Sequence, residues 1–127
     1  MNSTPPPRAN IELPIILHIK RLYKIVYQIG NGMPKRDKLG LHKIIEDKCI
    51  FILSFSIDSA LRPRDEKAEI LSILRRDIET LKHLIRLEYE LKIIKEKTYL
   101  YLAQILQDIS MMATGWHKSV QTQNPQK

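Results

Sequence analysis

The sequence predicts an all-α fold, an up-down four-helix bundle assembled as a homo-oligomer. Apolar residues recur at alternating spacings of three and four over most of the chain, which places them on one face of each helix. Glycine is scarce, at 4 of 127 residues, whereas sandwiches, barrels and dinucleotide-binding folds need many tight turns or Gly-rich loops. The length fits one domain. We place the bundle at residues 13–118 and expect disordered arms at 1–12 and 119–127.

The first helix is expected to begin at Pro14, because a proline is tolerated in the first turn of a helix. It ends in the Gly- and Pro-containing residues 30–34. Its apolar arc is about twice the ~100° stripe that a surface helix needs. Such an arc suits a central helix in a tight bundle or an added subunit interface, and both stay open. The seam consists of Ile15, Ile19, Leu22, Val26 and Ile29.

The second helix is predicted from about Pro34 or Lys38 to Ser59, and its pattern is the least regular. Residues 50–57, with the sequence IFILSFSI, alternate and are rich in β-branched and aromatic side chains, as strands are. No other segment alternates, so a strand here would lack a partner. Consistency with the rest of the chain favours a helix.

Two further seams predict the third and fourth helices. Asp65 is expected to cap the third helix. No Gly or Pro occurs in residues 66–113, so local signals also permit one long helix. The third seam continued in phase meets Glu88, Lys92 and Lys95, and polar residues on a core face indicate a reversal near 92–95. The seams are Leu71, Leu74, Ile78, Leu81 and Ile85, then Leu102, Ile105, Ile109, Met112 and Trp116.

Trp116, the only tryptophan, is expected to anchor the core. Gly115 precedes it. A glycine inside a helix costs about 1 kcal/mol relative to alanine, so we expect a close approach by a neighbouring helix or subunit at this point.

The positive charge is unevenly distributed. Residues 1–64 hold 11 basic and 5 acidic side chains, whereas residues 65–127 hold 10 and 9. Compositional drift would predict an even spread and an anion-binding patch an uneven one, and both interpretations stay open. The candidate basic residues in 20–43, against Asp37 alone, are Lys20, Arg21, Lys24, Lys35, Arg36, Lys38 and Lys43.

The motifs of common enzymes and metal sites are absent from the sequence. One cysteine excludes a disulfide framework and a Cys-based zinc site. A site built from His18, His42, His83 and His117 is conceivable, but His42/Glu46 and Glu79/His83 more simply support a solvated helix face. No export signal or membrane span is visible, so we expect a cytoplasmic protein. Because the motifs named above are absent, we also expect no cofactor and no metal.

One enzyme motif remains as an alternative. Residues 76–83 read R-x6-H, which resembles the catalytic signature of HEPN ribonucleases, where a His and an Arg act on the RNA 2′-OH and phosphate. Arg76 and His83 fall opposite the core positions Leu71 and Leu74. Exposed polar residues are expected there in any helix, so we do not expect an enzyme.

Three stretches resemble one known family. They are MPKRDKLG at 33–40, LKHLIRL at 81–87 and ISMMATGW at 109–116, preceded by the Leu13-Pro14 entrance to the first helix. In this order they are similar to the four-helix-bundle family of rRNA intervening-sequence proteins and accessory variability determinant (Avd) proteins of diversity-generating retroelements. The sequence FSIDSA at 55–60 replaces the "N-I-A-E-G" of the intervening-sequence branch, which favours the Avd branch.

The resemblance implies a non-enzymatic homopentamer that partners a reverse transcriptase and binds its template RNA or DNA. Lys82 and Arg86 match basic positions of the family's third helix, and Arg75 lies on the same predicted helix. The matched stretches also contain Pro34, Gly40, Gly115 and Trp116 as structural positions. The alternative is a four-helix-bundle RNA-binding protein that is unconnected with a retroelement, if no retroelement lies beside its gene.

The basic groups are not interleaved with exposed aromatic residues in the predicted arrangement, because Tyr23 and Tyr27 are expected to face the bundle. Binding should then depend on phosphate contacts, with little sequence preference and a steep loss of affinity in salt.

Overall fold

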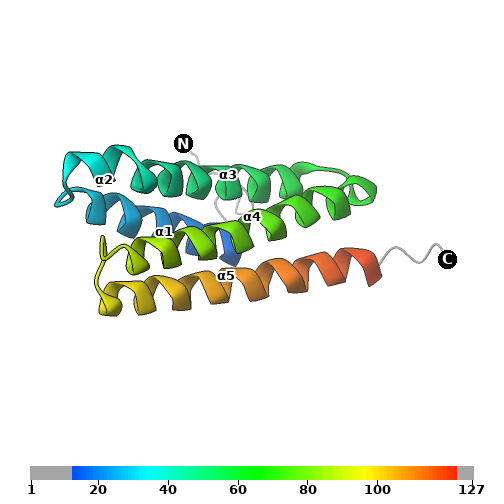
Figure 1. The fold of residues 1–127 in the computed structure, drawn as a ribbon. Helices are drawn as coiled ribbons and strands as arrows, with labels where there is room; N and C mark the ends of the chain where they lie inside the picture. Colours follow the sequence, from blue (N-terminus) through cyan, green and yellow to red (C-terminus); the bar gives the residue numbers. More distant parts are fainter. Residues whose placement is uncertain (1–12, 123–127) are drawn as a thin grey trace, which may run out of the picture.

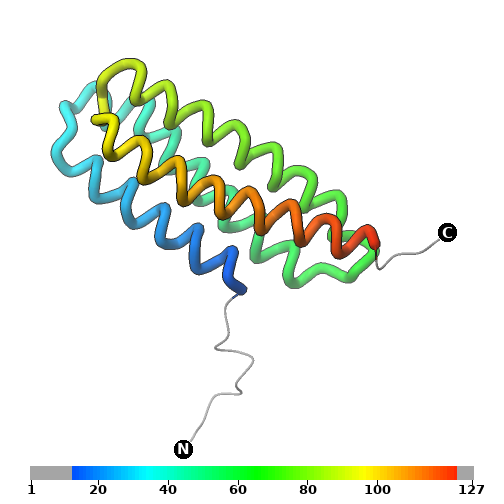
Figure 2. Tube along the Cα trace, turned by 90° about the horizontal axis from the view of Figure 1, so that it is seen from below, coloured from blue at the N-terminus to red at the C-terminus, as the bar shows by residue number. Residues whose placement is uncertain are grey.

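The computed structural model describes residues 13–122, and over that range the protein is all-helical, as predicted, with no strand. The long helices are α1 (Pro14–Gly30), α3 (Leu41–Leu61), α4 (Arg64–Glu90) and α5 (Glu96–Thr122), with a short α2 (Lys35–Leu39) before α3 (Figure 1). α1 contacts α3, α3 contacts α4, α4 contacts α5, and α5 contacts α1, so the four long helices pack around one core (Figure 2).

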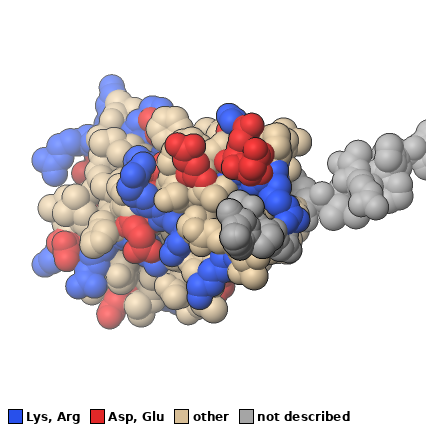
Figure 3. Space-filling view, turned by 90° about the vertical axis from the view of Figure 1, so that its right-hand side faces the viewer, with Lys and Arg blue, Asp and Glu red and all other residues tan. Residues whose placement is uncertain are grey.

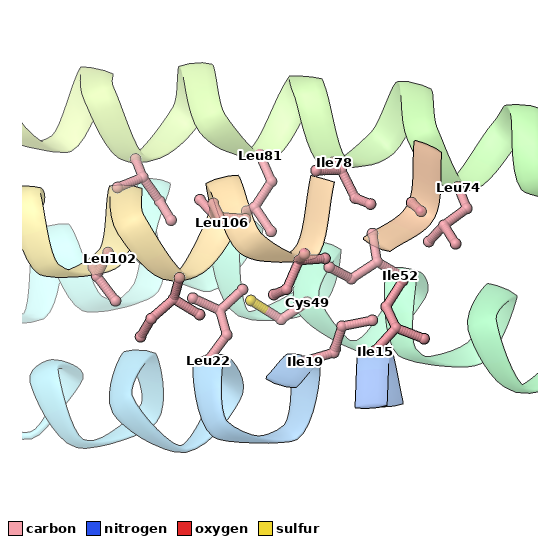
Figure 4. Close-up of a cluster of buried hydrophobic side chains, with 14 of the residues drawn as sticks. Ile15, Ile19, Leu22, Cys49, Ile52, Leu74, Ile78, Leu81, Leu102 and Leu106 are labelled. Carbon is pink, nitrogen blue, oxygen red and sulfur yellow. The ribbon is translucent and has the colours of Figure 1, made fainter. Parts of the chain in front are cut away.

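The core is formed by the predicted seams. Figure 4 shows Leu22, Cys49, Leu81 and Leu106, one from each long helix, pointing toward a common interior. The third-helix seam is fully buried, whereas Met112 and Trp116 at the end of the fourth are only partly buried. Residues 50–57 are helical. The predicted arm at 1–12 lies outside the described residues, as do residues 123–127 of the arm predicted at 119–127. The prediction of disorder is wrong for residues 119–122, which form the end of α5, with Val120 buried.

Gly40 divides the predicted second helix in two. α2 ends at Leu39 and α3 begins at Leu41. The prediction of a single helix from Pro34 or Lys38 is therefore wrong. A Cβ on Gly40 would lie 2.7 Å from the carbonyl oxygen of Arg36, so the backbone approaches too closely here for any other residue. Pro34 is the residue that precedes α2.

The reversal predicted near 92–95 occurs at residues 91–95. The Ile93 N–H donates to the Glu88 carbonyl and the Lys92 N–H to the Tyr89 carbonyl, both at 2.9 Å, which is the pattern of a Schellman cap. Lys92 has a φ of 63°, at the position where glycine is usual. Because a lysine and not a glycine occupies this position, the sequence contains no local signal for the turn.

Replacing Lys92 with glycine should stabilise the protein. A left-handed conformation costs a non-glycine residue about 1 kcal/mol, so Lys92→Gly should raise the free energy of unfolding by about that amount in urea denaturation. Lys92→Ala removes the same charge and keeps the Cβ, so it should not stabilise. Equal stabilisation by both variants would attribute the effect to charge and contradict the backbone argument.

A buried polar pair joins three helices at the end of the bundle that carries α2. His42 on α3 and Glu88 on α4 are each 1% exposed, and His42 Nδ1 lies 2.6 Å from Glu88 Oε2. His42 Nε2–H donates to the Val26 carbonyl of α1 at 2.7 Å. The predicted solvated face of His42 and Glu46 is therefore wrong at His42. Glycine is favoured at Gly30, because a Cβ there would lie 3.1 Å from the His42 ring.

The partners of His42 define its protonation. A carbonyl only accepts, so Nε2 carries a proton, and a second proton is held between Nδ1 and Glu88. Burial lowers the pKa of His42. The hydrogen bonds to Glu88 and Val26 and the charges of Glu88 and Glu46 outweigh burial, so the pKa lies above its ordinary 6.5.

This pair predicts a specific pH dependence of stability. A raised folded-state pKa means that the contribution is complete below about pH 6.5 and is lost as pH rises through the folded-state value. Wild type should therefore lose more stability than Glu88→Gln between about pH 6.5 and pH 9 in urea denaturation at fixed protein concentration. Parallel pH profiles for the two proteins would contradict the protonated pair.

At neutral pH, His42→Ala leaves the Glu88 carboxylate buried without its partner. It should cost about 3–5 kcal/mol, as breaking a buried pair does. Glu46→Gln is the matched control, because Glu46 lies 3.9 Å from His42 Nε2 and is partly exposed. It should cost well under 1 kcal/mol.

Candidate nucleic-acid interface

Two connections bring basic residues from distant parts of the chain to one end of the molecule. The link between α1 and α3 and the turn between α4 and α5 lie at the same end of the bundle (Figure 1). Residues 35–43 and 90–97 hold seven basic and three acidic side chains, and all seven basic residues are exposed. We call this surface the basic end. Its members are Lys35, Arg36, Lys38, Lys43, Lys92, Lys95 and Lys97.

Most of the basic residues of this surface are not neutralised by ion pairs within the described part of the chain. Lys43 pairs with Asp47 at 3.0 Å, and this hydrogen bond raises the pKa of Lys43. Arg36 lies 3.8 Å from Asp37, with a side chain that is 95% exposed. Within residues 13–122, the other five members make no ion pair. The opposite end is different, because Figure 3 shows basic and acidic side chains interspersed over it.

The predicted cluster at 20–43 is therefore split. Lys35, Arg36, Lys38 and Lys43 belong to the basic end, but the members on α1 lie along the length of the bundle. Arg21 donates to the Tyr101 hydroxyl at 2.9 Å and lies over its ring, which joins α1 to α5. Lys20 is half-buried and Lys24 is exposed. Lys92, Lys95 and Lys97 were missed, since only the position of the 91–95 turn brings them to the same end of the molecule as α2 (Figure 1).

A hollow lined partly by tyrosines lies near the carboxyl end of α1. Its volume is about 360 Å³, and it is lined by Tyr23, Lys24, Tyr27, Gln28 and Asn31. Tyr27 is 56% exposed, so the prediction that both tyrosines face the bundle is wrong for this residue. The two rings lie 6.1 Å apart and are tilted by 33°. The hollow combines an exposed aromatic face, side-chain amides and a cation, which is the chemistry that unpaired bases require.

The three candidates on α4 lie on the shoulder that faces α5. Lys82 pairs with Glu79 at 2.9 Å and reaches Gln107 at 3.4 Å. Arg75 contacts His117 Nδ1 at 2.9 Å, so both basic residues bridge α4 and α5. These contacts show that Lys82 and Arg75 contribute to helix packing, and each is half-buried.

Arg86 is the most exposed of the three. Its guanidinium lies 5.8 Å from the centre of the Tyr99 ring and pairs with Glu90 at 3.2 Å. Hydrogen bonding to Tyr99 and to Glu90 raises the pKa of Arg86. Tyr99 in turn stacks on Tyr89, with ring centres 4.8 Å apart, so this cluster supports the turn that carries Lys92 and Lys95.

The nuclease candidates are not gathered around one hollow. Arg76 and His83 are both exposed on the outer face of α4. Arg76 lines a hollow of about 300 Å³ with Ser72, Arg75, Glu79, Ser110 and Thr114, but His83 is not among the lining residues.

Metal-binding geometry is also absent from residues 13–122, where no group of three or more His, Cys, Asp or Glu side chains is placed to hold an ion. Cys49 is buried in the core, and burial raises the pKa of its thiol to about 12. None of the described helices combines the length and apolar character that crossing a membrane requires.

No protein-family model matches the chain, and a search of curated proteins finds no significant match. The candidate interface therefore rests on the placement of its own residues.

Proposed function

We propose that this protein is a non-catalytic, nucleic-acid-binding accessory protein of a diversity-generating retroelement, and that it acts with the reverse transcriptase on template RNA or DNA. The binding part rests on one observation, the convergence of seven exposed basic residues from two connections at one end of the bundle. The retroelement part rests on the resemblance of residues 33–40, 81–87 and 109–116 to Avd proteins.

The basic end suits a phosphate backbone better than a folded acidic partner. Its lysines are long, exposed and mostly unpaired, so they adapt to a flexible chain of charges and release counterions on binding. The hollow at Tyr27 adds a stacking surface, and stacking of one base on an aromatic ring contributes about 1–3 kcal/mol. Together these features favour single-stranded RNA or DNA over a duplex, whose bases are already stacked.

Charge reversal at the basic end should weaken binding. We expect Lys35→Glu/Lys38→Glu and Lys92→Glu/Lys95→Glu each to lower affinity for a labelled single-stranded RNA by about tenfold or more in fluorescence anisotropy, because phosphate contacts are lost. Lys82→Glu/Arg86→Glu tests the positions implied by the resemblance. Arg64→Glu/Lys118→Glu is the matched control, since it makes the same charge change at the opposite end. Wild-type affinity should also fall steeply with salt.

An equal loss in the control, or an affinity that ignores salt, would contradict the proposal. The RNA should also be recovered intact. Cleavage that His83→Ala abolishes would instead favour the HEPN-like ribonuclease.

A homo-oligomer is the second part of the proposal, and the pentamer is the form that the resemblance implies. Most of the apolar arc of α1 is used inside the chain, with Ile15, Ile16 and Ile19 buried. α3 leaves more large apolar side chains exposed than any other described helix, and these provide a surface for subunit contacts. The exposed ones are Ile44, Ile50, Phe51, Ile57 and Leu61.

Light scattering of the purified protein should give a mass near five times 14.9 kDa. Ile50→Glu/Ile57→Glu should reduce that mass, because charges would be buried in the contact. Leu100→Glu, a change at another exposed leucine on α5, is the control and should leave the mass unchanged. A monomer at micromolar concentration would contradict this part of the proposal.

A further inference from the structure

The four long helices differ in length, and the difference falls at one end. α1 has 17 residues, whereas α4 and α5 have 27 each. At 1.5 Å per residue, α1 is about 15 Å shorter than α4 and α5. All four long helices reach the α2 end, so α3, α4 and α5 continue beyond the start of α1 at the other end (Figures 1 and 2).

The missing length leaves an apolar hollow of about 580 Å³. Trp116 is half-buried in its wall, and Gly115 beside it is exposed. Apart from its two chain neighbours and the backbone of its own helical turns, no heavy atom of the described chain lies within 4 Å of the position of a Gly115 Cβ, so no other helix among residues 13–122 makes the predicted close approach. The lining residues are Leu13, Pro14, Ile15, Ala60, Lys67, Met112, Gly115 and Trp116.

Lys67 is the one basic residue in this lining. Its ammonium donates to the Ser59 carbonyl at 2.5 Å and to the Ala60 carbonyl at 3.2 Å, so it caps the carboxyl end of α3. An ammonium has three donors, and these two bonds use two of them. The hollow thus offers an apolar wall with one cation at its edge.

We propose that the chain's own residues 8–12 occupy this hollow, with Ile11 against Trp116 and Met112 and with the Glu12 carboxylate paired to Lys67. The chain enters at Leu13, which itself lines the hollow and has an extended backbone, with φ −63° and ψ 145°. Extended residues span about 3.3 Å each, so five residues cover the roughly 15 Å that α1 lacks.

The chemistry of this segment complements the hollow. Ile11 is the only large apolar residue in 2–12, and Glu12 is the only acidic residue in 1–12. The apolar wall and the single cation therefore each have one counterpart in the residues directly before Leu13. Attachment to α1 holds the segment at a high effective concentration beside the hollow, an advantage that a separate partner lacks.

Trp116 reports on the occupant, because it is the only tryptophan in the chain. In the full-length protein, Ile11→Ser should shift its emission to the red and raise acrylamide quenching about twofold, because the indole is returned to water. Asn10→Ser is the matched control and should change neither signal. Far-UV circular dichroism checks that each variant keeps its helices.

The ion pair is tested by exchanging its charges. Glu12→Lys and Lys67→Glu should each raise quenching, and the combined variant should return it toward wild type, because the pair is restored in reverse. Quenching that is unchanged in Ile11→Ser, or that is not restored in the combined variant, would overturn the proposal. Quenching of wild type that falls as protein concentration rises would also overturn it, in favour of a second copy as the occupant.

Discussion

The contact between His42, Glu88 and the Val26 carbonyl holds together the end of the bundle on which the proposed function depends. It joins α1, α3 and α4 through two short hydrogen bonds in a region from which water is excluded. Burying both groups is costly, and the cost is offset only because each imidazole nitrogen has a partner. Gly30 lets α1 approach the ring closely enough for these bonds to form. The α2 connection and the 91–95 turn are positioned by the helices that this contact joins.

The two ends of the molecule consequently differ in chemistry. Helices of 17 and 27 residues that meet at the α2 end leave α1 short at the other end. The α2 end combines exposed lysines with the Tyr27 hollow, and it suits a flexible polyanion. The opposite end has mixed charges (Figure 3) and an apolar hollow beside Trp116 with Lys67 at its edge, and it suits a chain segment that carries one large apolar and one acidic side chain. The shortness of α1 therefore accounts for the apolar hollow beside Trp116, whose chemistry differs from that of the basic end.

The spacing of the apolar residues correctly predicted most of the buried helix faces. The seams of α4 and most of that of α5 are buried as expected, because alternating spacings of three and four are a direct consequence of helix geometry. The break at Gly40 was missed, since a five-residue helix is too short to show a period. Glu88, Lys92 and Lys95 together predicted the reversal, but Glu88 is a buried residue inside α4, and its pairing with His42 depends on a contact across 46 positions. Sequence analysis also missed that Lys92 and Lys95 belong to the basic end, because only the packing of the helices brings them to the same end as Lys35 (Figure 1).

The most direct test of the central claim is lysine footprinting with a fixed amount of acetylating reagent, read by mass spectrometry with and without saturating single-stranded RNA. Convergence of the two connections predicts that Lys35, Lys38, Lys92 and Lys95 become protected together, although the first two are more than 50 positions from the last two in the sequence. Lys118, exposed near the opposite end, should react equally in both samples. Protection of Lys118 while the basic end reacts as in the free protein would contradict the proposed interface.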